Sequence, residues 1–136
     1  MPTSEPEVLS KIPLFSHLSS RQVRKLLKTT MEHRYEADTT IVREGSRTTT
    51  LYVLLEGSVK IVRDGRTISR RDPGEYFGEI ALIDSGPRSA TIVATTDLRC
   101  QGITAWEFRP FIEEHPEVAW PLLETLASRL RDAEKR

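Results

Sequence analysis

The middle of the chain is a series of short strand-like segments separated by turn residues, and this series restricts the fold more than any other feature. β-branched and aromatic residues recur in segments that are too short for helices. The pair Asp64-Gly65 predicts a two-residue hairpin turn, which needs residues that tolerate positive φ at both positions. The predicted strands are 31–35, 40–42, 50–55, 58–63, 66–70, 89–94 and 98–103. We therefore predict that residues 31–103 form an antiparallel β-roll, a double-stranded, jelly-roll-like barrel.

Helical patterns precede the strands, in residues 1–30. A short helix is expected near Glu7 to Lys11, after a polar tail. Ser19 and Ser20 suit the start of a second helix, in which apolar residues at helical spacing oppose a basic face. The apolar positions of this second helix are Val23, Leu26, Leu27 and Thr30. We expect these N-terminal helices to pack one face against the rest of the chain.

Two more helices are predicted after the strands, in residues 104–136. Thr104 and Glu107 have the spacing of a capping box, and the helix they begin continues to about Glu114. Pro116 suits the first turn of the last helix, whose apolar stripe comprises Ala119, Leu122, Leu123, Leu126 and Leu130. Pro121 either kinks this helix or marks its true first turn, and the sequence leaves both possibilities open. The whole chain, 1–136, is thus predicted to be one mainly β domain with flanking helices.

A glycine, a glutamate and an arginine between two predicted strands suggest a ligand site. Gly78 lets the backbone approach a ligand closely, and a short helix beginning near Glu79 would direct unpaired N–H groups at a negative charge. Arg88 supplies a planar, charged donor fork for phosphate oxygens. A carboxylate beside a phosphate repels it unless the carboxylate accepts a hydrogen bond from another group, such as a sugar hydroxyl. Separately, these residues would be a solvated arginine and a helix-start acid, but their combination favours a ligand site.

The segment 77–91 resembles the phosphate-binding cassette of cyclic nucleotide-binding domains, found in bacterial catabolite activator proteins, protein kinase A regulatory subunits and nucleotide-gated channels. Upstream, Ile12 to Phe15, Ile41 to Gly45 and Leu51 to Gly57 resemble the family's initial turn and earlier strands, so the resemblance covers nearly the whole chain.

This resemblance also implies site residues. Glu79 would bind the ribose 2′-hydroxyl and Arg88 the cyclic phosphate. Ile68 and Ser69 correspond to residues near the nucleotide in some members. Backbone groups around the ligand would come from Gly78, Ile80, Ala81, Ser89 and Ala90.

The implied ligand is cyclic AMP or cyclic GMP, with no other cofactor. Ser89 follows Arg88 where cyclic GMP-selective relatives often carry threonine, so we expect a modest preference for cyclic AMP. Ser46 and Thr48 depart from the residues that the family often has there. We expect both to lie away from the cassette and to affect only the shape of their loop.

The implied function is that of a sensor in which the nucleotide orders the cassette and repositions the C-terminal helices toward a second copy or an effector protein. A nucleotide-free interaction module of the same fold, or the sensor part of a larger transcription regulator, are the alternatives. No nucleophile with a base and no paired acids form a catalytic pattern, so we expect no enzyme. The chain ends at Arg136 without a recognition helix, so direct nucleic-acid binding is not expected.

Composition supports a cytoplasmic, non-membrane protein. The chain has 20 basic and 20 acidic residues and zero formal net charge, so no net field attracts nucleic acid or an anionic membrane. Its longest apolar run, Leu51 to Leu55, is far shorter than the roughly 20 residues that a membrane-spanning helix needs.

The remaining chemically distinctive residues are expected to be structural. The single cysteine, Cys100, is predicted to be a buried, inert thiol. Histidines 17, 33 and 115 are too far apart in the sequence to suggest a metal centre. Trp106 and Trp120 are expected in the core or at an interface, and the Arg70-Arg71 pair on a solvated face.

Overall fold

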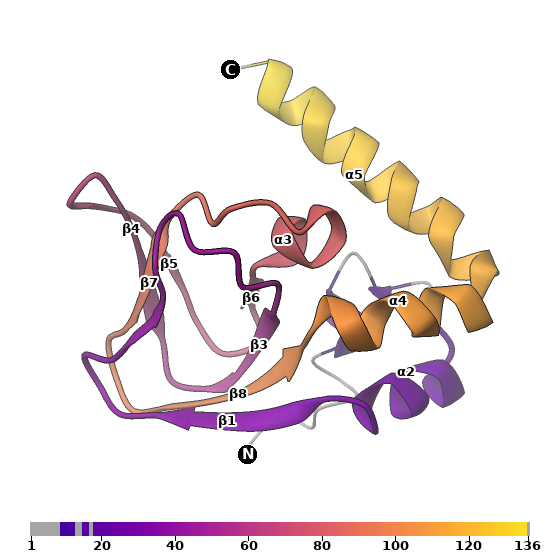
Figure 1. The fold of residues 1–136 in the computed structure, drawn as a ribbon, viewed down its shortest axis with the longest axis horizontal. Helices are drawn as coiled ribbons and strands as arrows, with labels where there is room; N and C mark the ends of the chain where they lie inside the picture. Colours follow the sequence, from indigo (N-terminus) through magenta and orange to yellow (C-terminus); the bar gives the residue numbers. More distant parts are fainter. Residues whose placement is uncertain (1–8, 13–14, 17, 136) are drawn as a thin grey trace.

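The computed structural model describes residues 9–12, 15–16 and 18–135, and within these residues the strands form two antiparallel sheets of four strands each (Figure 1). The first sheet contains, in hydrogen-bonded order, β1 (Met31–Tyr35), β8 (Leu98–Ile103), β3 (Leu51–Glu56) and β6 (Tyr76–Phe77). The second contains β2 (Thr40–Val42), β7 (Thr91–Ala94), β4 (Val59–Arg63) and β5 (Arg66–Arg71). The predicted β-roll is confirmed, and it consists of two separate sheets rather than one closed barrel.

The hairpin between β4 and β5 has the predicted turn. Arg63 pairs with Arg66, and Asp64 and Gly65 between them have φ values of 53° and 77°. Positive φ at both central residues matches the right-handed twist of the two strands. All seven predicted strands agree with the structure to within one or two residues at each end, and among the described strands only the two-residue β6 was not predicted.

Strand β3 lies between two hydrophobic clusters and is buried along nearly its whole length. Tyr52 and Leu54 belong to the cluster inside the roll, which also contains Phe77 and Cys100. Leu51, Val53 and Leu55 belong to the cluster beneath the helices. Successive side chains of a strand point to opposite faces, so β3 joins the roll to the helices through its two faces.

The helices at the N-terminal end agree with the sequence in part. In α2 (Ser20–Leu27), Ser19 and Gln22 form a reciprocal capping box, and Val23 and Leu26 are buried. Thr30 lies beyond the end of this helix. Leu9 to Lys11 are helical, whereas Glu7 and Pro13, parts of the predicted first helix and initial turn, lie outside the described residues.

The bounds of the C-terminal helices show whether Pro121 kinks the last helix or lies in its first turn. Helix α4 (Ala105–Glu114) begins at the predicted capping box of Thr104 and Glu107. A 3-10 turn, η2 (Pro116–Val118), then precedes α5 (Ala119–Glu134), so Pro121 lies in the first turn of α5, where its missing N–H costs no helical hydrogen bond. Figure 1 shows α5 extending from the end of α4 past the short helix α3 (Glu79–Asp84). Among the described residues, no helix is both long and apolar enough to cross a membrane.

The structure tests the expected burial of Cys100 and of the two tryptophans. Cys100 is buried, as predicted, and burial raises the pKa of its thiol to about 12, which keeps it protonated and unreactive. Trp106 and Trp120 are 88% and 69% exposed, so neither lies in the core, and the other expected position, at an interface, stays a prediction. The apolar stripe of α5 is also divided, because Leu122 is buried whereas Leu123 and Leu130 are exposed.

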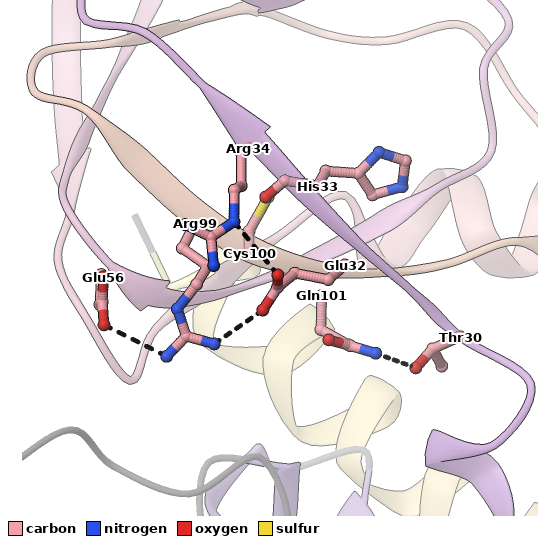
Figure 2. A network of polar contacts seen from close by, with 8 residues as sticks. All are labelled: Thr30, Glu32, His33, Arg34, Glu56, Arg99, Cys100 and Gln101. Carbon is pink, nitrogen blue, oxygen red and sulfur yellow. Dashed lines mark hydrogen bonds and ion pairs between the residues drawn. The ribbon is translucent and has the colours of Figure 1, made fainter.

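A polar network crosses the first sheet near its surface (Figure 2). Arg99 on β8 donates to Glu32 on β1 over 2.8 Å and to Glu56 on β3 over 3.3 Å. These bonds join the side chains of three adjacent strands. They lower the pKa of the Glu32 carboxyl, chiefly through the hydrogen bond from Arg99.

Candidate functional site

A cavity of about 280 Å³ lies between β4, β5 and the segment that begins at Phe77. The residues that the sequence singled out as candidates all line this cavity, namely Ile68, Ser69, Gly78, Glu79, Ile80, Ala81, Arg88, Ser89 and Ala90. They come from β5, α3 and the loop before β7. The fold therefore gathers candidates from two regions of the sequence around one space.

Gly78 is the N-cap residue of α3 and has a backbone conformation that glycine favours. Its φ is 96°, in the left-handed region. A Cβ at this position would lie 2.5 Å from Nη1 of Arg88 and 2.7 Å from the carbonyl oxygen of Thr50. The lack of a side chain at Gly78 therefore lets the Arg88 guanidinium lie directly against the start of α3.

Arg88 is held by the loop that joins β2 to β3, residues 43–50. The side chain is buried, with 7% of the residue exposed. Its Nε donates to Oγ1 of Thr48 over 3.2 Å and its Nη2 to the carbonyl oxygen of Thr50 over 2.5 Å. Burial lowers the pKa of the Arg88 guanidinium, but an arginine remains charged at neutral pH.

The same loop also binds the backbone of Arg88. The Arg88 N–H donates to the carbonyl oxygen of Ser46, and the Gly45 N–H donates to that of Arg88, both over 2.8 Å. The expectation that Ser46 and Thr48 lie away from the cassette is therefore wrong. The four strands β3 to β6 separate the two segments in sequence, and only the folding of the roll brings the segments into contact.

Glu79 is nearly buried and makes an ion pair with the last helix. Its side chain is 11% exposed, and its Oε1 accepts a hydrogen bond from Nη2 of Arg129 over 2.5 Å. Burial opposes the charge of Arg129, but the hydrogen bond and the charge of Glu79 outweigh burial and raise the pKa of Arg129. Helix α5 is thus joined to the wall of the cavity by a charged contact.

Several residues of this site were missed by sequence reasoning. Arg129 and Thr48 gave no local signal, because each forms a hydrogen bond with a residue 40 or more positions away.

Two arginines on the cavity wall were also not predicted as site residues. Arg63 lines the cavity and donates from Nε to the carbonyl oxygen of Ser89 over 3.0 Å. Arg71 also lines the cavity, which corrects its assignment to a solvated face. It is two residues from Ser69 on β5, and period-two alternation would have placed both side chains on one face.

The cavity offers two opposite charges to a ligand. Arg88 presents a fixed, buried cation, and Glu79 presents a carboxylate that accepts hydrogen bonds. A ligand that carries an anionic group and a hydroxyl at a suitable separation would satisfy both. Within the described residues, no three His, Cys, Asp or Glu side chains are grouped closely enough to hold a metal ion.

The comparison with known families agrees with this geometry. The family model described as "Cyclic nucleotide-binding domain" matches residues 32–115, which include both sheets and the cavity. The chain belongs to the cyclic nucleotide-binding domain family. The matched region contains the whole segment 77–91, including Glu79 and Arg88, which resembles the cassette of this family.

Two relatives of this cyclic nucleotide-binding domain are bacterial proteins whose names refer to cyclic AMP. The chain is 30% identical, over 92% of its length, to the "CRP-like cAMP-activated global transcriptional regulator" of Mycobacterium tuberculosis, and 33% identical, over 90%, to the "Cyclic AMP receptor protein" of Thermus thermophilus. The chain spans only 58% and 59% of these two proteins. The crystal structure of the N-terminal domain of a transcriptional regulator from Streptomyces coelicolor A3(2) is similar with a TM-score of 0.84 and 34% identity, covering 94% of this chain and 93% of that one.

Proposed function

We propose that this cyclic nucleotide-binding domain is a sensor whose ligand is cyclic AMP, and that binding repositions α5. The observation that carries the proposal is the pairing of two buried, oppositely charged side chains, Glu79 and Arg88, on one cavity. A buried charge is costly unless it is compensated, so two of them beside an open space favour a ligand that compensates both. The relatives described as cAMP-activated and as a cyclic AMP receptor support this choice of ligand.

In the proposed complex, Arg88 binds the cyclic phosphate and Glu79 accepts a hydrogen bond from the ribose 2′-hydroxyl. Backbone groups of Gly78, Ile80, Ala81, Ser89 and Ala90 surround the sugar and phosphate. Ile68 and Ser69, on the opposite wall of the cavity, lie toward the base. The nucleotide is bound and released unchanged, without a catalytic step.

The proposed signal passes through α5. Arg129 of α5 binds the carboxylate that is assigned to the ribose, so any change in the position or hydrogen bonding of Glu79 changes the contact that holds α5. A ligand shifts a conformational equilibrium only by its differential affinity for the two states, and Glu79 provides such a difference. Both the nucleotide and α5 bind to this one residue.

The proposed output is a protein contact made by α5. Trp120, Leu123 and Leu130 expose apolar surface on this helix, and this surface would meet a second copy of the chain or an effector. The Mycobacterium tuberculosis relative, of which the chain spans 58%, is a transcriptional regulator, and this favours the sensor part of a larger transcription regulator as the setting of this domain. We expect no direct binding of nucleic acid by the described residues.

Calorimetric titration of the chain with cyclic AMP, cyclic GMP and linear AMP tests the proposal. We expect saturable binding of cyclic AMP with one site per chain, weaker binding of cyclic GMP, and no comparable binding of AMP, whose phosphate is not closed into a ring with the ribose. Cyclic AMP recovered after long incubation should be chemically unchanged. A folded chain that binds neither cyclic nucleotide would show that the domain is an interaction module of the same fold.

A further inference from the structure

The loop between β2 and β3, residues 43–50, holds the cassette at Arg88 through both backbone and side chain. Two backbone hydrogen bonds of 2.8 Å join Arg88 to Gly45 and Ser46. A third bond, from the N–H of Glu44 to Oγ1 of Thr91, extends this contact over 2.9 Å. The position of the Arg88 Cα is therefore set by a segment that the family resemblance did not connect with the ligand.

The orientation of the guanidinium is set by the same loop. Nε donates to the Thr48 hydroxyl and Nη2 to the carbonyl oxygen of Thr50, so one edge of the planar group is fixed. The backbone of Gly78 lies against the Nη1 end. The N–H groups of Nη1 and the second N–H of Nη2 have no hydrogen bond to any residue that the structure describes, and they suit the two oxygens of an anion.

We infer that Thr48 is a positioning residue for the phosphate-binding arginine, an inference that rests on the proposed function. Among the described residues, Thr48 is the one side chain that forms a hydrogen bond with the Arg88 guanidinium; the other acceptor, at Thr50, is a backbone carbonyl. The planar guanidinium binds an anion through two hydrogen bonds only when its plane faces the anion. The hydrogen bond from Nε to Thr48 opposes rotation of the guanidinium out of that orientation. The hydroxyl is also neutral, so Arg88 keeps its whole charge for the ligand.

The hydroxyl can be removed with little harm to the fold. Thr48 is exposed, in a loop, so substitution there leaves the hydrophobic clusters intact. Thr49 provides a matched control. It lies in the same loop, and its hydroxyl accepts a hydrogen bond from the N–H of Ala105 rather than from Arg88.

The test compares Thr48→Val, Thr48→Ser and Thr49→Val by calorimetric titration with cyclic AMP and with the two phosphorothioate diastereomers, in which sulfur replaces one or the other exocyclic oxygen. We expect Thr48→Val to weaken binding of cyclic AMP by about 5- to 30-fold, less than the loss of a charged hydrogen bond made directly to the ligand, because Thr48 acts only through the orientation of Arg88. It should also reduce the ratio between the affinities for the two diastereomers, because that ratio depends on how the guanidinium faces each oxygen. Thr48→Ser and Thr49→Val should remain within about threefold of the parent in affinity and should keep its ratio.

The outcomes separate the two proposals. Binding by Thr48→Val within about twofold of the parent, or a loss no larger than that of Thr49→Val, would overturn the role of Thr48 while leaving nucleotide binding intact. A loss of affinity with an unchanged diastereomer ratio would show that Thr48 only supports the loop, and would also overturn the role. If Thr48→Val melts well below the parent, Thr48→Ala provides the same comparison. A parent chain that is folded but binds no cyclic AMP would overturn the proposed function and this inference together.

Discussion

Arg129, near the end of α5, donates a hydrogen bond over 2.5 Å to Glu79, the first residue of α3. The two residues are 50 positions apart, and the bond joins the last helix to the wall of the ligand cavity. Glu79 has a second carboxylate oxygen without a hydrogen bond to the described part of the chain. The contact with Arg129 thus leaves Glu79 able to accept a bond from a ligand hydroxyl, and under the proposed function this contact would make the position of α5 depend on that ligand.

Replacing Arg129 by methionine should separate nucleotide binding from the response of α5. In the parent, saturating cyclic AMP should change hydrogen exchange in two regions, 78–90 and 118–130. In Arg129→Met the response of 78–90 should remain, and that of 118–130 should fall by about half or more. The affinity should change by no more than about fivefold, because an ion pair with a partly exposed arginine contributes only about 1 kcal/mol.

Arg131→Met is the matched control for the exchange experiment, since Arg131 lies on the same helix and makes no ion pair with a described residue. The control should behave like the parent in both regions. A normal response of 118–130 in Arg129→Met would contradict a signal through Glu79. A parent in which only 78–90 responds would be a nucleotide binder without the proposed switch.

Arg88→Ala should nearly abolish binding of cyclic AMP. Truncating one partner of a buried, charge-assisted contact costs roughly 2 to 5 kcal/mol, which is about 30-fold to several thousand-fold in affinity. Arg88→Lys should lie between this variant and the parent, because lysine keeps the charge but not the planar fork. Calorimetry measures the affinities, and circular dichroism checks that each variant is folded. An alanine variant that binds within about threefold of the parent would contradict the assignment of Arg88 to the phosphate.

Glu79→Gln should weaken binding of cyclic AMP by about 1.5 to 3 kcal/mol, roughly 10- to 150-fold, because a charged hydrogen bond to the ribose is replaced by a neutral one. The decisive ligand is 2′-deoxy cyclic AMP, which lacks the hydroxyl assigned to Glu79. The parent should bind this analogue much more weakly than cyclic AMP, whereas Glu79→Gln should discriminate far less between the two ligands. Equal discrimination by the variant and the parent would show that Glu79 does not contact the 2′-hydroxyl.

Ser89→Thr should increase the affinity for cyclic GMP relative to cyclic AMP. Ser89 lines the cavity next to Arg88, and the added methyl group of threonine restricts the rotamer of the hydroxyl. We expect a modest shift of about three- to tenfold in the ratio of the two dissociation constants, measured in parallel titrations. The parent should favour cyclic AMP. A tenfold or greater preference of the parent for cyclic GMP would contradict the interpretation of Ser89.

Glu32→Gln should reduce the loss of stability of the fold in acid. The hydrogen bond from Arg99 lowers the pKa of Glu32 below its ordinary value of 4.5 (Figure 2). A carboxyl with a lowered pKa in the folded state stabilises the fold above its ordinary pKa, and this contribution is lost as the pH falls through the lowered value. The melting temperature of Glu32→Gln should therefore decrease less than that of the parent as the pH falls below 4.5.

Glu36→Gln is the control for the acid experiment, because the side chain of Glu36 makes no ion pair with a residue that the structure describes. Its melting temperature should follow that of the parent over the same pH range. If Glu32→Gln and Glu36→Gln had the same acid dependence as the parent, the contact between Glu32 and Arg99 would make no contribution to stability.

The local features of this protein were determined by the sequence alone. The hairpin at Asp64 and Gly65, the capping box at Thr104 and the strand positions follow from φ preferences and from period-two alternation, which act over a few residues. The short helix that begins at Glu79 and the arginine that follows it belong to one continuous segment, so their spacing could be read directly.

The contacts between distant segments were decided only by the tertiary structure. Thr48 contacts Arg88 across 40 positions, and Arg129 contacts Glu79 across 50. Neither pair follows a helical or strand period, so no local pattern could indicate it. The exposure of Trp106 and Trp120 likewise depends on where α4 and α5 leave the roll. The sequence by itself indicated residues that line the cavity, and the packing of the roll and α5 decided which other residues hold them in place, because these contacts form only after distant segments meet.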